Sequence, residues 1–172
     1  MNKLGIDTEV LSENDTKQRL GAHGFVGGIK YLGDASIHPL KLMTEMINNF
    51  GGNIKIYENH EVFSIESVGD KKVIKTNQHN FNSDIVIMAT NGYSPLLNSY
   101  FSDKISATRG QILCTESLPM FMEGPCYANF VLDYFRQLPT GELLIGGFRQ
   151  LQKDSEVGYS DETTQIIQTA LE

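Results

Sequence analysis

The chain has 172 residues, of which 40% are hydrophobic and 20% charged; this is the composition of a globular protein long enough to form a hydrophobic core. Its formal net charge of −7 argues against nucleic-acid binding, because phosphate contacts need clustered Lys and Arg. No run approaches the ~18 apolar residues that span a bilayer, and the first residues lack the apolar stretch of a signal peptide. Two cysteines, Cys114 and Cys126, have no metal-ligand spacing. We therefore expect a cytoplasmic protein with no metal site.

The first third of the chain predicts short helices and strands in alternation. Ser12 is a suitable N-cap for a helix over residues 12–20, and residues 25–32 are typical of a strand. Pro39 is well placed to begin a helix, and apolar residues recur at helical spacing from there to residue 50. Residues 54–56 indicate a short strand just after the glycine pair that ends this helix.

The middle of the chain predicts a hairpin followed by a buried strand. Residues 61–68 and 72–76 form the expected hairpin, and residues 77–83 a polar turn. Residues 84–90 are nearly all apolar and often β-branched, which predicts a strand buried on both faces of a parallel sheet. A helix over residues 93–101 is expected next. This order is typical of the second half of a doubly wound nucleotide-binding domain.

The pattern changes to longer strands after Ala107. Strands are expected over residues 111–115, 128–138 and 142–149, and they predict an antiparallel sheet. Ser160 is the expected N-cap of a final helix that has no stop signal before Glu172. The predicted fold class is therefore α+β with α/β elements. It combines a partial doubly wound nucleotide-binding layer with a mixed, largely antiparallel sheet and flanking helices.

The sequence lacks a phosphate-binding loop. A flavin or nicotinamide dinucleotide is held by a Gly-rich turn that opens a helix. The glycine pairs Gly27-Gly28, Gly51-Gly52 and Gly146-Gly147 do not fit G-x-G-x-x-G between a strand and a helix. We therefore expect that this chain does not bind a dinucleotide by itself.

Several segments between about residues 20 and 150 resemble, in order, the FAD-dependent oxidoreductase family that includes D-amino-acid, glycine and sarcosine oxidases. The segments are Gly27–Tyr31 with Ile37–Leu42, Glu61–Ile65, Ala89–Ser94, Arg109–Gln111, and Asp133–Arg136 with Gly146–Arg149. Most of the family has Ala-x-Gly where this chain has Ala89-Thr90-Asn91. The sequence Asn91-Gly92-Tyr93 is similar to the gamma-glutamylputrescine oxidase-like branch. Neither cysteine matches the position that holds the flavin covalently in sarcosine oxidases.

The resemblance implies roles for individual residues. On the flavin side it implies Val62, through its backbone, and the loop of Thr90, Asn91 and Gly92. On the substrate side it implies Tyr134, Arg136 and Arg149. Strand alternation places Tyr134 and Arg136 on one face and Phe135 and Gln137 on the other. An Arg can hold a substrate carboxylate with two parallel hydrogen bonds, whereas an exposed strand face with an ordinary salt bridge is the alternative. For Arg109 we predict a structural role, bridging the two domains through backbone carbonyls.

The predicted function is that of a central fragment of an FAD-dependent oxidoreductase that oxidises an amine or amino acid, inactive on its own. Residues 20–36 and 103–160 are assigned to the substrate-binding sheet, residues 37–102 to part of the FAD-binding domain, and residues 161–172 to the start of a truncated helix. The expected partners are a small amine or amino acid, with no nucleic acid, no membrane span, and a homodimer through exposed sheet edges. Two alternatives are a non-catalytic binding or partner-docking module, and an FAD dehydrogenase acting on a hydroxy acid or glycerol phosphate.

Overall fold

The computed structural model describes residues 5–130 and 132–172, and the fold is α+β with antiparallel sheets. The chain divides into two compact units. Unit 1 contains Met1–Met46, Gly110–Gln152 and Thr163–Glu172, and unit 2 contains Ile47–Arg109 and Lys153–Glu162. No helix among the described residues is long and apolar enough to cross a membrane.

Unit 1 begins with a strand, a helix and a strand. β1 (Thr8–Ser12) and β2 (Gly27–Tyr31) pair antiparallel, and α1 (Glu13–Leu20) lies between them in sequence. The predicted cap is confirmed: the Ser12 hydroxyl accepts a hydrogen bond from the Asp15 amide at 3.2 Å, and the Asp15 carboxylate accepts one from the Ser12 amide. This reciprocal capping box satisfies two backbone donors, which favours helix initiation at this point.

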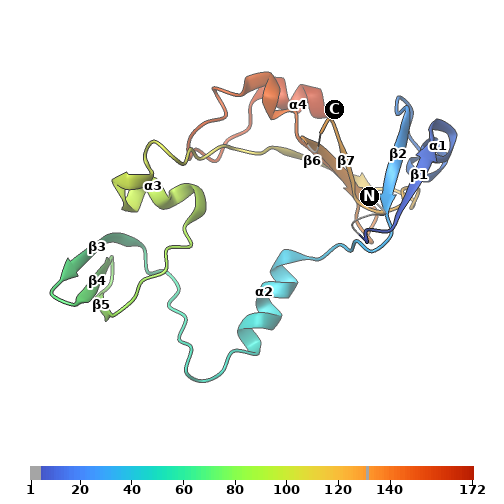
Figure 1. Cartoon of the computed structure of the whole chain (residues 1–172). Coiled ribbons are helices and arrows are strands. Elements are labelled where there is room, and N and C mark those ends of the chain that lie inside the picture. Colours follow the sequence, from blue (N-terminus) through green and yellow to red (C-terminus); the bar gives the residue numbers. More distant parts are fainter. Residues whose placement is uncertain (1–4, 131) are drawn as a thin grey trace. The chain divides into compact units, whose positions relative to one another are not determined.

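A four-stranded sheet forms the larger part of unit 1 (Figure 1). Its strands are β6 (Ile112–Ser117), β7 (Cys126–Ala128), β8 (Asp133–Gln137) and β9 (Glu142–Gly146), in the order β6-β9-β8-β7. The predicted strand over residues 128–138 is wrong in its extent. Asn129 and Phe130 have φ of 48° and 56°, a left-handed conformation that a strand does not tolerate, so the chain turns between β7 and β8.

The last helix of unit 1 begins later than the sequence predicts. η4 (Arg149–Gln152) follows β9, and α4 (Gln165–Leu171) has Thr164, not Ser160, as its N-cap. Ser160 instead accepts hydrogen bonds from the Arg109 guanidinium through its hydroxyl and its carbonyl oxygen. Ser160 is thus engaged by Arg109 and is not available to cap α4, although its residue type and position favour an N-cap.

Unit 2 contains a three-stranded antiparallel sheet. β3 (Val62–Val68), β4 (Lys71–Thr76) and β5 (Asn80–Ser83) lie in that order, with a register shift between Val62 and Ser64. The β3–β4 hairpin is as predicted, but β5 replaces the second half of the expected polar turn. The Thr76 hydroxyl donates to the carbonyl of His79 at 2.7 Å, so the chain reverses within three residues and pairs again.

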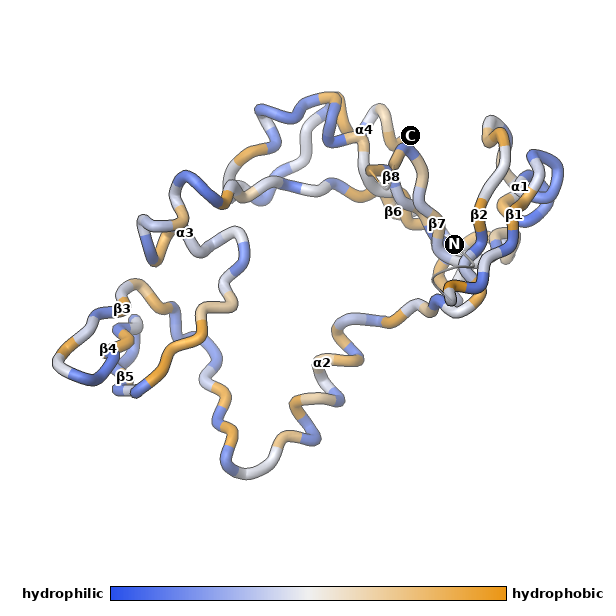
Figure 2. The backbone as a smooth tube through the Cα atoms, in the orientation of Figure 1, coloured by the Kyte–Doolittle hydropathy of each residue, from blue (hydrophilic) through white to orange (hydrophobic). Residues whose placement is uncertain are grey.

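Residues 84–90 do not form the predicted buried parallel strand. No parallel strand pair occurs among the described residues, and Ile85 and Ile87 are 76% and 87% exposed. Figure 2 shows this segment as the hydrophobic stretch just after β5. A strand needs a hydrogen-bonded neighbour, and the described part of the chain offers none here. The short strand expected over residues 54–56 is absent for the same reason.

The helix predicted over residues 93–101 is broken into three short pieces. These are η2 (Asn91–Tyr93), α3 (Ser94–Leu97) and η3 (Ser99–Phe101). Asn98 has an extended backbone, and its side chain accepts a hydrogen bond from the Tyr100 amide at 2.9 Å. Asn98 thus ends one helical piece and caps the next, which a continuous helix does not allow.

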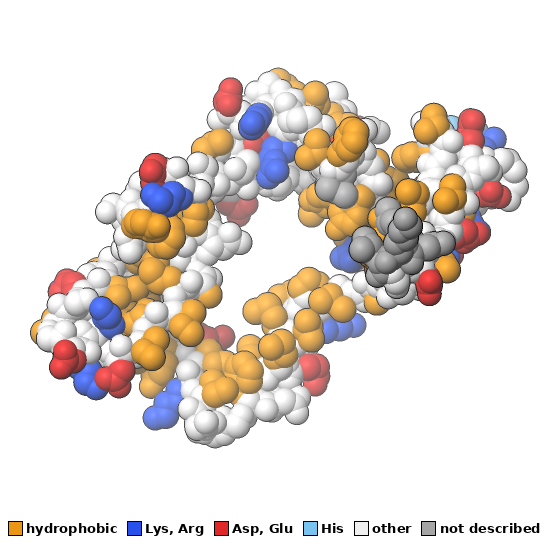
Figure 3. Space-filling view, viewed as in Figure 1, with side chains coloured by type: hydrophobic (Ala, Val, Ile, Leu, Met, Phe, Trp, Pro, Cys, Tyr) orange, Lys and Arg blue, Asp and Glu red, His pale blue; other side chains and the backbone are white. Residues whose placement is uncertain are grey.

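The apolar core is smaller than the chain length predicts. Among the described residues, the buried hydrophobic side chains are Met122, Ile167 and Leu171. Helix α2 (Pro39–Asn48) forms as predicted but buries none of its residues. Figure 3 shows its hydrophobic side chains at the surface. The other buried side chains are polar or charged: Gln111, Asp133, Glu156, Thr76, Thr16 and Ser94.

Candidate functional site

Tyr134 and Arg136 lie on the same face of the four-stranded sheet, as strand alternation predicts. Tyr134 is paired with Gly146 on β9 and with Tyr127 on β7, and Arg136 is paired with Leu144. Residues paired directly across antiparallel strands share a face. Tyr127 is 69% exposed, whereas Tyr134 and Arg136 are half-buried. We call this surface, with Tyr127, Tyr134, Arg136 and Leu144, the open face.

The opposite face of this sheet is covered. Gln111, just before β6, bonds through its side chain to Thr164 and Gln168 at the start of α4. On the same side, Phe135 has its ring 5.8 Å from that of Phe25. Ile112, on the open face, is 52% exposed. One face therefore carries the packing contacts of α4, and the other presents an aromatic ring and a guanidinium.

The ring of Tyr134 lies directly over the backbone of Gly146. A Cβ atom added to Gly146 would lie 2.6 Å from the Tyr134 hydroxyl oxygen and still closer to two ring carbons. At Gly110 an added Cβ would lie 3.9 Å from the same hydroxyl oxygen. A glycine inside a strand often marks such a close approach. Gly146 thus leaves the space that the Tyr134 ring occupies, whereas a side chain at Gly110 would make only ordinary contact with it.

The side chain of Arg136 has no polar partner in the described part of the chain. Within residues 5–130 and 132–172, no hydrogen bond or ion pair engages its guanidinium. A half-buried guanidinium that has five donors and no protein partner can bind an anionic group, and its planar fork matches a carboxylate. The sheet therefore presents a guanidinium and an aromatic ring side by side, and binding of a carboxylate there stays a prediction.

Arg149 lies at the start of η4 and is exposed. The turn before it is held by Asp133, whose buried carboxylate accepts a hydrogen bond from the Phe148 amide at 2.8 Å and another from the Asn129 side chain. Gly147 and Phe148 have φ of 130° and 55°. Sequence reasoning missed this role of Asp133. The turn after β9, in which both residues have positive φ, is held by a hydrogen bond from the Phe148 amide to Asp133, and no local sequence pattern predicts this contact.

Gln137 fastens a second loop against the covered face. Its side-chain oxygen accepts hydrogen bonds from the Phe121 and Met122 amides at 3.0 and 3.3 Å. Its amide nitrogen donates to the carbonyls of Leu118, Pro119 and Gly141. One side chain thereby fixes five backbone groups, which holds β8 and its Tyr134–Arg136 pair in a defined register.

Three residues predicted on the flavin side form one turn in unit 2. The Thr90 and Ser94 hydroxyl oxygens are 2.9 Å apart, and Asn91 has φ of 44°. The carbonyl of Gly92 accepts a hydrogen bond from the Tyr159 hydroxyl at 2.9 Å. Thr90, Asn91 and Gly92 are thus adjacent in a tightly bonded turn, and their contact with a cofactor stays a prediction.

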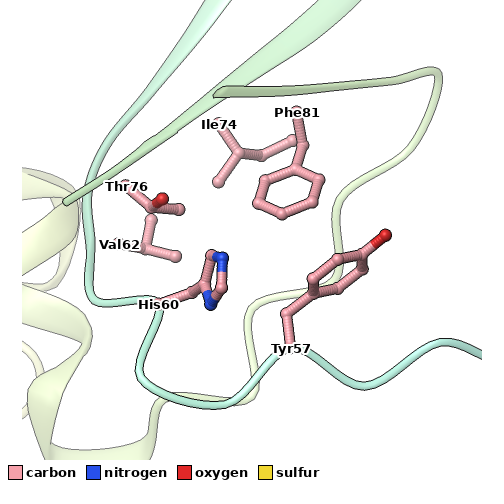
Figure 4. A pocket seen from close by; sticks show the side chains of 6 residues that line it. All are labelled: Tyr57, His60, Val62, Ile74, Thr76 and Phe81. Atoms are coloured by element: carbon pink, nitrogen blue, oxygen red, sulfur yellow. The ribbon is translucent and has the colours of Figure 1, made fainter. Parts of the chain in front are cut away.

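Val62, the fourth residue predicted on the flavin side, begins β3 and lines a pocket of about 240 Å³. Figure 4 shows its side chain beside Thr76 and His60, with the rings of Tyr57 and Phe81 opposite. The prediction concerned only the backbone of Val62. Sequence reasoning missed the aromatic side chains that surround it, because they come from separate segments of the chain.

Arg109 is held in a network of hydrogen bonds and ion pairs, whereas the predicted bridge between two domains through backbone carbonyls is not seen, because its partners lie in the same unit. Its Nε donates to the Glu156 carboxylate at 3.1 Å, and its other nitrogens bond the Ser155 carbonyl, both oxygens of Ser160, and the Glu162 carboxylate at 3.2 Å. Glu156 is 1% exposed. The hydrogen bond to Glu156 raises the pKa of Arg109 above its ordinary value. All these partners belong to unit 2, so the hydrogen bonds and ion pairs of Arg109 fix the segment of residues 155–162 to the Arg109 side chain.

The described residues do not fit the pyrophosphate of a flavin dinucleotide. Among residues 5–130 and 132–172, no helix opens with a Gly-rich turn. The first turn of α1 is already occupied by the Asp15 carboxylate, and α2 begins at Pro39, which has no N–H to donate. We therefore assign no contact to FAD and derive no reaction step through it.

Comparison of the sequence with known proteins finds a family model and two curated relatives that are all described as oxidoreductases. The family model described as "DAO: FAD dependent oxidoreductase" matches residues 1–172. Two curated relatives are described as "Probable oxidoreductase OrdL". The protein of Rhizobium meliloti is 29% identical over 144 residues, and that of Haemophilus influenzae is 27% identical over 153 residues. Each match covers 80% of this chain but only 34% and 35% of the relative, so the chain spans about a third of their length.

A solved structure shows the same fold. Glycine oxidase from Geobacillus kaustophilus matches with a TM-score of 0.72 and 16% identity, over 99% of this chain and 46% of that chain. At this identity the likeness concerns the fold alone. Together with the family match, it confirms the resemblance on which the expected fold class was based, whereas assignment to the gamma-glutamylputrescine oxidase-like branch stays a prediction.

Proposed function

Because this chain belongs to the FAD-dependent oxidoreductase family, we propose that it contributes the substrate-facing sheet of an enzyme that oxidises an amine or an amino acid. One observation carries the proposal: Tyr134 and Arg136 share the open face of the sheet, and the Arg136 guanidinium has no partner among the described residues. In this reaction class the hydride acceptor is the flavin, and the protein orients the substrate.

The side chains of the open face divide this work. The planar guanidinium of Arg136 donates two parallel hydrogen bonds to a carboxylate, which fixes one end of an amino-acid substrate. The ring of Tyr134, fixed over Gly146, forms an apolar wall that excludes water from one side of the substrate. An amine without a carboxylate would use the wall but not the guanidinium. The substrate class is thus set mainly by Arg136.

The test is amine-dependent reduction of flavin. The purified chain is incubated with excess FAD, desalted, and mixed without oxygen with glycine, sarcosine, lactate or glycerol 3-phosphate. Loss of the visible flavin absorbance with the two amines alone supports the proposal. Loss with lactate or glycerol 3-phosphate alone favours the hydroxy-acid or glycerol-phosphate dehydrogenase instead.

A variant pair separates binding from chemistry. Arg136→Gln should raise KM for sarcosine about 10–100-fold, the value of a lost charged hydrogen bond, and leave that for dimethylamine unchanged. Lys153→Gln, which removes one positive charge from an exposed residue outside the open face, is the matched control. An equal effect of both variants would contradict the role of Arg136. Arg149→Gln tests the third predicted substrate residue in the same way.

The non-catalytic binding module is favoured by one observation, the lack of a Gly-rich turn at any described helix. A chain that remains colourless after FAD treatment agrees with both hypotheses, because this chain is expected not to bind a dinucleotide by itself. Binding of sarcosine is then measured by NMR titration of the colourless chain. A chemical-shift change that Arg136→Gln abolishes would still assign the open face as an amino-acid site, without catalysis.

A further inference from the structure

Three residues with a left-handed backbone lie at one end of the four-stranded sheet. Asn129 and Phe130, in the turn between β7 and β8, have φ of 48° and 56°, and Phe148, just after β9, has φ of 55°. A bulky side chain such as Phe rarely adopts this conformation, because it costs free energy. Such strained residues persist only where the surrounding structure holds them, and they gather at functional sites. The contacts that hold these two turns are therefore candidates for a functional role.

One buried carboxylate holds both turns. Asp133 is 5% exposed and is the first residue of β8. Its Oδ1 accepts a hydrogen bond from the Phe148 amide at 2.8 Å, and its Oδ2 accepts one from the side-chain amide of Asn129. Both partners donate, so the side chain between them must accept at both atoms, which an ionised carboxylate does and a side-chain amide does not. Asp133 thus joins the β7–β8 turn to the turn after β9.

This joint lies directly beside the contact between Tyr134 and Gly146. These two residues form the last pair of the β8–β9 ladder at this end of the sheet. At the next position the Asp133 side chain takes the place of a ladder bond, because Gly147, with φ of 130°, and Phe148 have left the strand conformation. The fit is close, since a Cβ added to Gly147 would lie 2.7 Å from the Asp133 Cα. The position of the Gly146 backbone is therefore set one residue away, by Asp133.

We propose that Asp133 is a positioning residue for the open face. By joining the two turns, its carboxylate fixes the Gly146 backbone beneath the Tyr134 ring, and so fixes the ring as a wall for the substrate. Asp133 directly precedes Tyr134 on β8, so strand alternation places its own side chain off the open face. Its role in substrate binding rests on the function proposed above, whereas its effect on the Tyr134 ring does not.

The first test places a fluorine label on the ring. The full chain is produced with fluorotyrosine, and the Tyr134 signal in the fluorine NMR spectrum is identified by its loss in Tyr134→Phe. Asp133→Asn brings a second donor against the Asn129 side chain, so it should shift or broaden the Tyr134 signal. Asp34→Asn, at an exposed aspartate of the same unit, is the matched control and should leave this signal unchanged. An unchanged Tyr134 signal in folded Asp133→Asn would overturn the proposal.

A swap of the two side chains separates positioning from general destabilisation. In the double variant Asn129→Asp, Asp133→Asn, the side chain at position 133 accepts from the Phe148 amide and donates to the carboxylate at position 129, with the net charge unchanged. We expect the double variant to return the Tyr134 signal to its original position, even where Asp133→Asn alone does not fold. Circular dichroism checks folding. A double variant that is unfolded, or that keeps the displaced signal, would refute the role of this joint.

Sarcosine binding then tests the consequence for the substrate. In an NMR titration of the colourless chain, Asp133→Asn should weaken binding of sarcosine about 3–10-fold, the value of an aromatic contact, and the double variant should restore it. Unaltered binding in a variant whose Tyr134 signal is displaced would contradict the role of Asp133 in substrate binding. If the unmodified chain does not bind sarcosine, the function proposed above is wrong, and the fluorine spectra still decide whether Asp133 positions the ring.

Discussion

The position of the Tyr134 ring over Gly146 makes a quantitative prediction for the variant Gly146→Ala. The new Cβ would lie 2.6 Å from the Tyr134 hydroxyl oxygen, whereas real Cβ atoms essentially never come closer than 3.0 Å to another heavy atom. The ring would therefore have to move by about 1 Å to restore ordinary contact at 3.4–4 Å. Overpacking of this kind costs about 1–3 kcal/mol of the free energy of unfolding. Because Tyr134 is half-buried and its ring can tilt outward, we expect a loss of about 1–2 kcal/mol.

A double-mutant cycle separates this clash from a general intolerance at position 146. In a Tyr134→Ala background the same Gly146→Ala change should be neutral or stabilising by about 0.4–1 kcal/mol, since alanine restricts the unfolded chain. The resulting coupling energy is about 2 kcal/mol. Urea unfolding followed by circular dichroism is the assay, because the chain has no Trp; the expected loss lowers the urea midpoint by roughly 0.5–1 M.

Gly33→Ala is the matched control, because its Cβ would meet nothing within 4 Å. We expect it to change the unfolding midpoint little. If Gly146→Ala is equally destabilising with and without the Tyr134 ring, the ring does not lie over Gly146, and the geometry of the open face described above is wrong.

Three further predictions concern stability and reactivity. Ile167→Ala, at a residue 1% exposed, should lower the free energy of unfolding by about 2–5 kcal/mol, whereas Ile166→Ala, at a residue 52% exposed on the same helix, should cost under about 1 kcal/mol in the same urea assay. Iodoacetamide should label exposed Cys114 before Cys126, whose pKa is raised by burial and by the nearby Glu123; equal rates in a mass-spectrometric time course would contradict this. The hydrogen bond from the Ser12 hydroxyl lowers the pKa of the Asp15 carboxyl below its ordinary 3.8. The stability that this carboxylate contributes is therefore present above pH 3.8 and is lost as the pH falls through the pKa that Asp15 has in the folded protein. Asp15→Asn should remove this part of the acid dependence of the free energy of unfolding, measured in a pH series.

The parts of the fold that the sequence predicted are those fixed by neighbouring residues. Ser12 and Asp15 are three positions apart and cap α1 through contacts that any helix start can form. Pro39 begins α2 for a similarly local reason. The side of the sheet on which Tyr134 and Arg136 lie follows from alternation alone, once β8 is a strand.

The remaining features depend on residues far apart in the chain. The Asp133 and Gln137 side chains bond backbone groups up to 19 positions away, and no periodicity reports such contacts. Ser160 has the residue type of an N-cap, but the Arg109 network engages it instead. The pocket beside Val62 is formed by side chains from the 57–60 loop and from three strands. Its existence could be recognised only once β3, β4 and β5 were paired.

The unpaired segment that follows β5 has a consequence for the behaviour of the protein in solution. Residues 85–90 contain no charge and no proline and are rich in β-forming side chains, which is the composition of amyloid-forming peptides. Asp84, directly before them, has the position of a gatekeeper residue, and we expect its charge to oppose stacking of identical chains. Its carboxylate pairs with Lys71 at the surface, and this pairing partly neutralises the charge. Salt screens both the pairing and the repulsion between chains. Replacement of Asp84 by Asn should therefore make concentrated samples aggregate more readily.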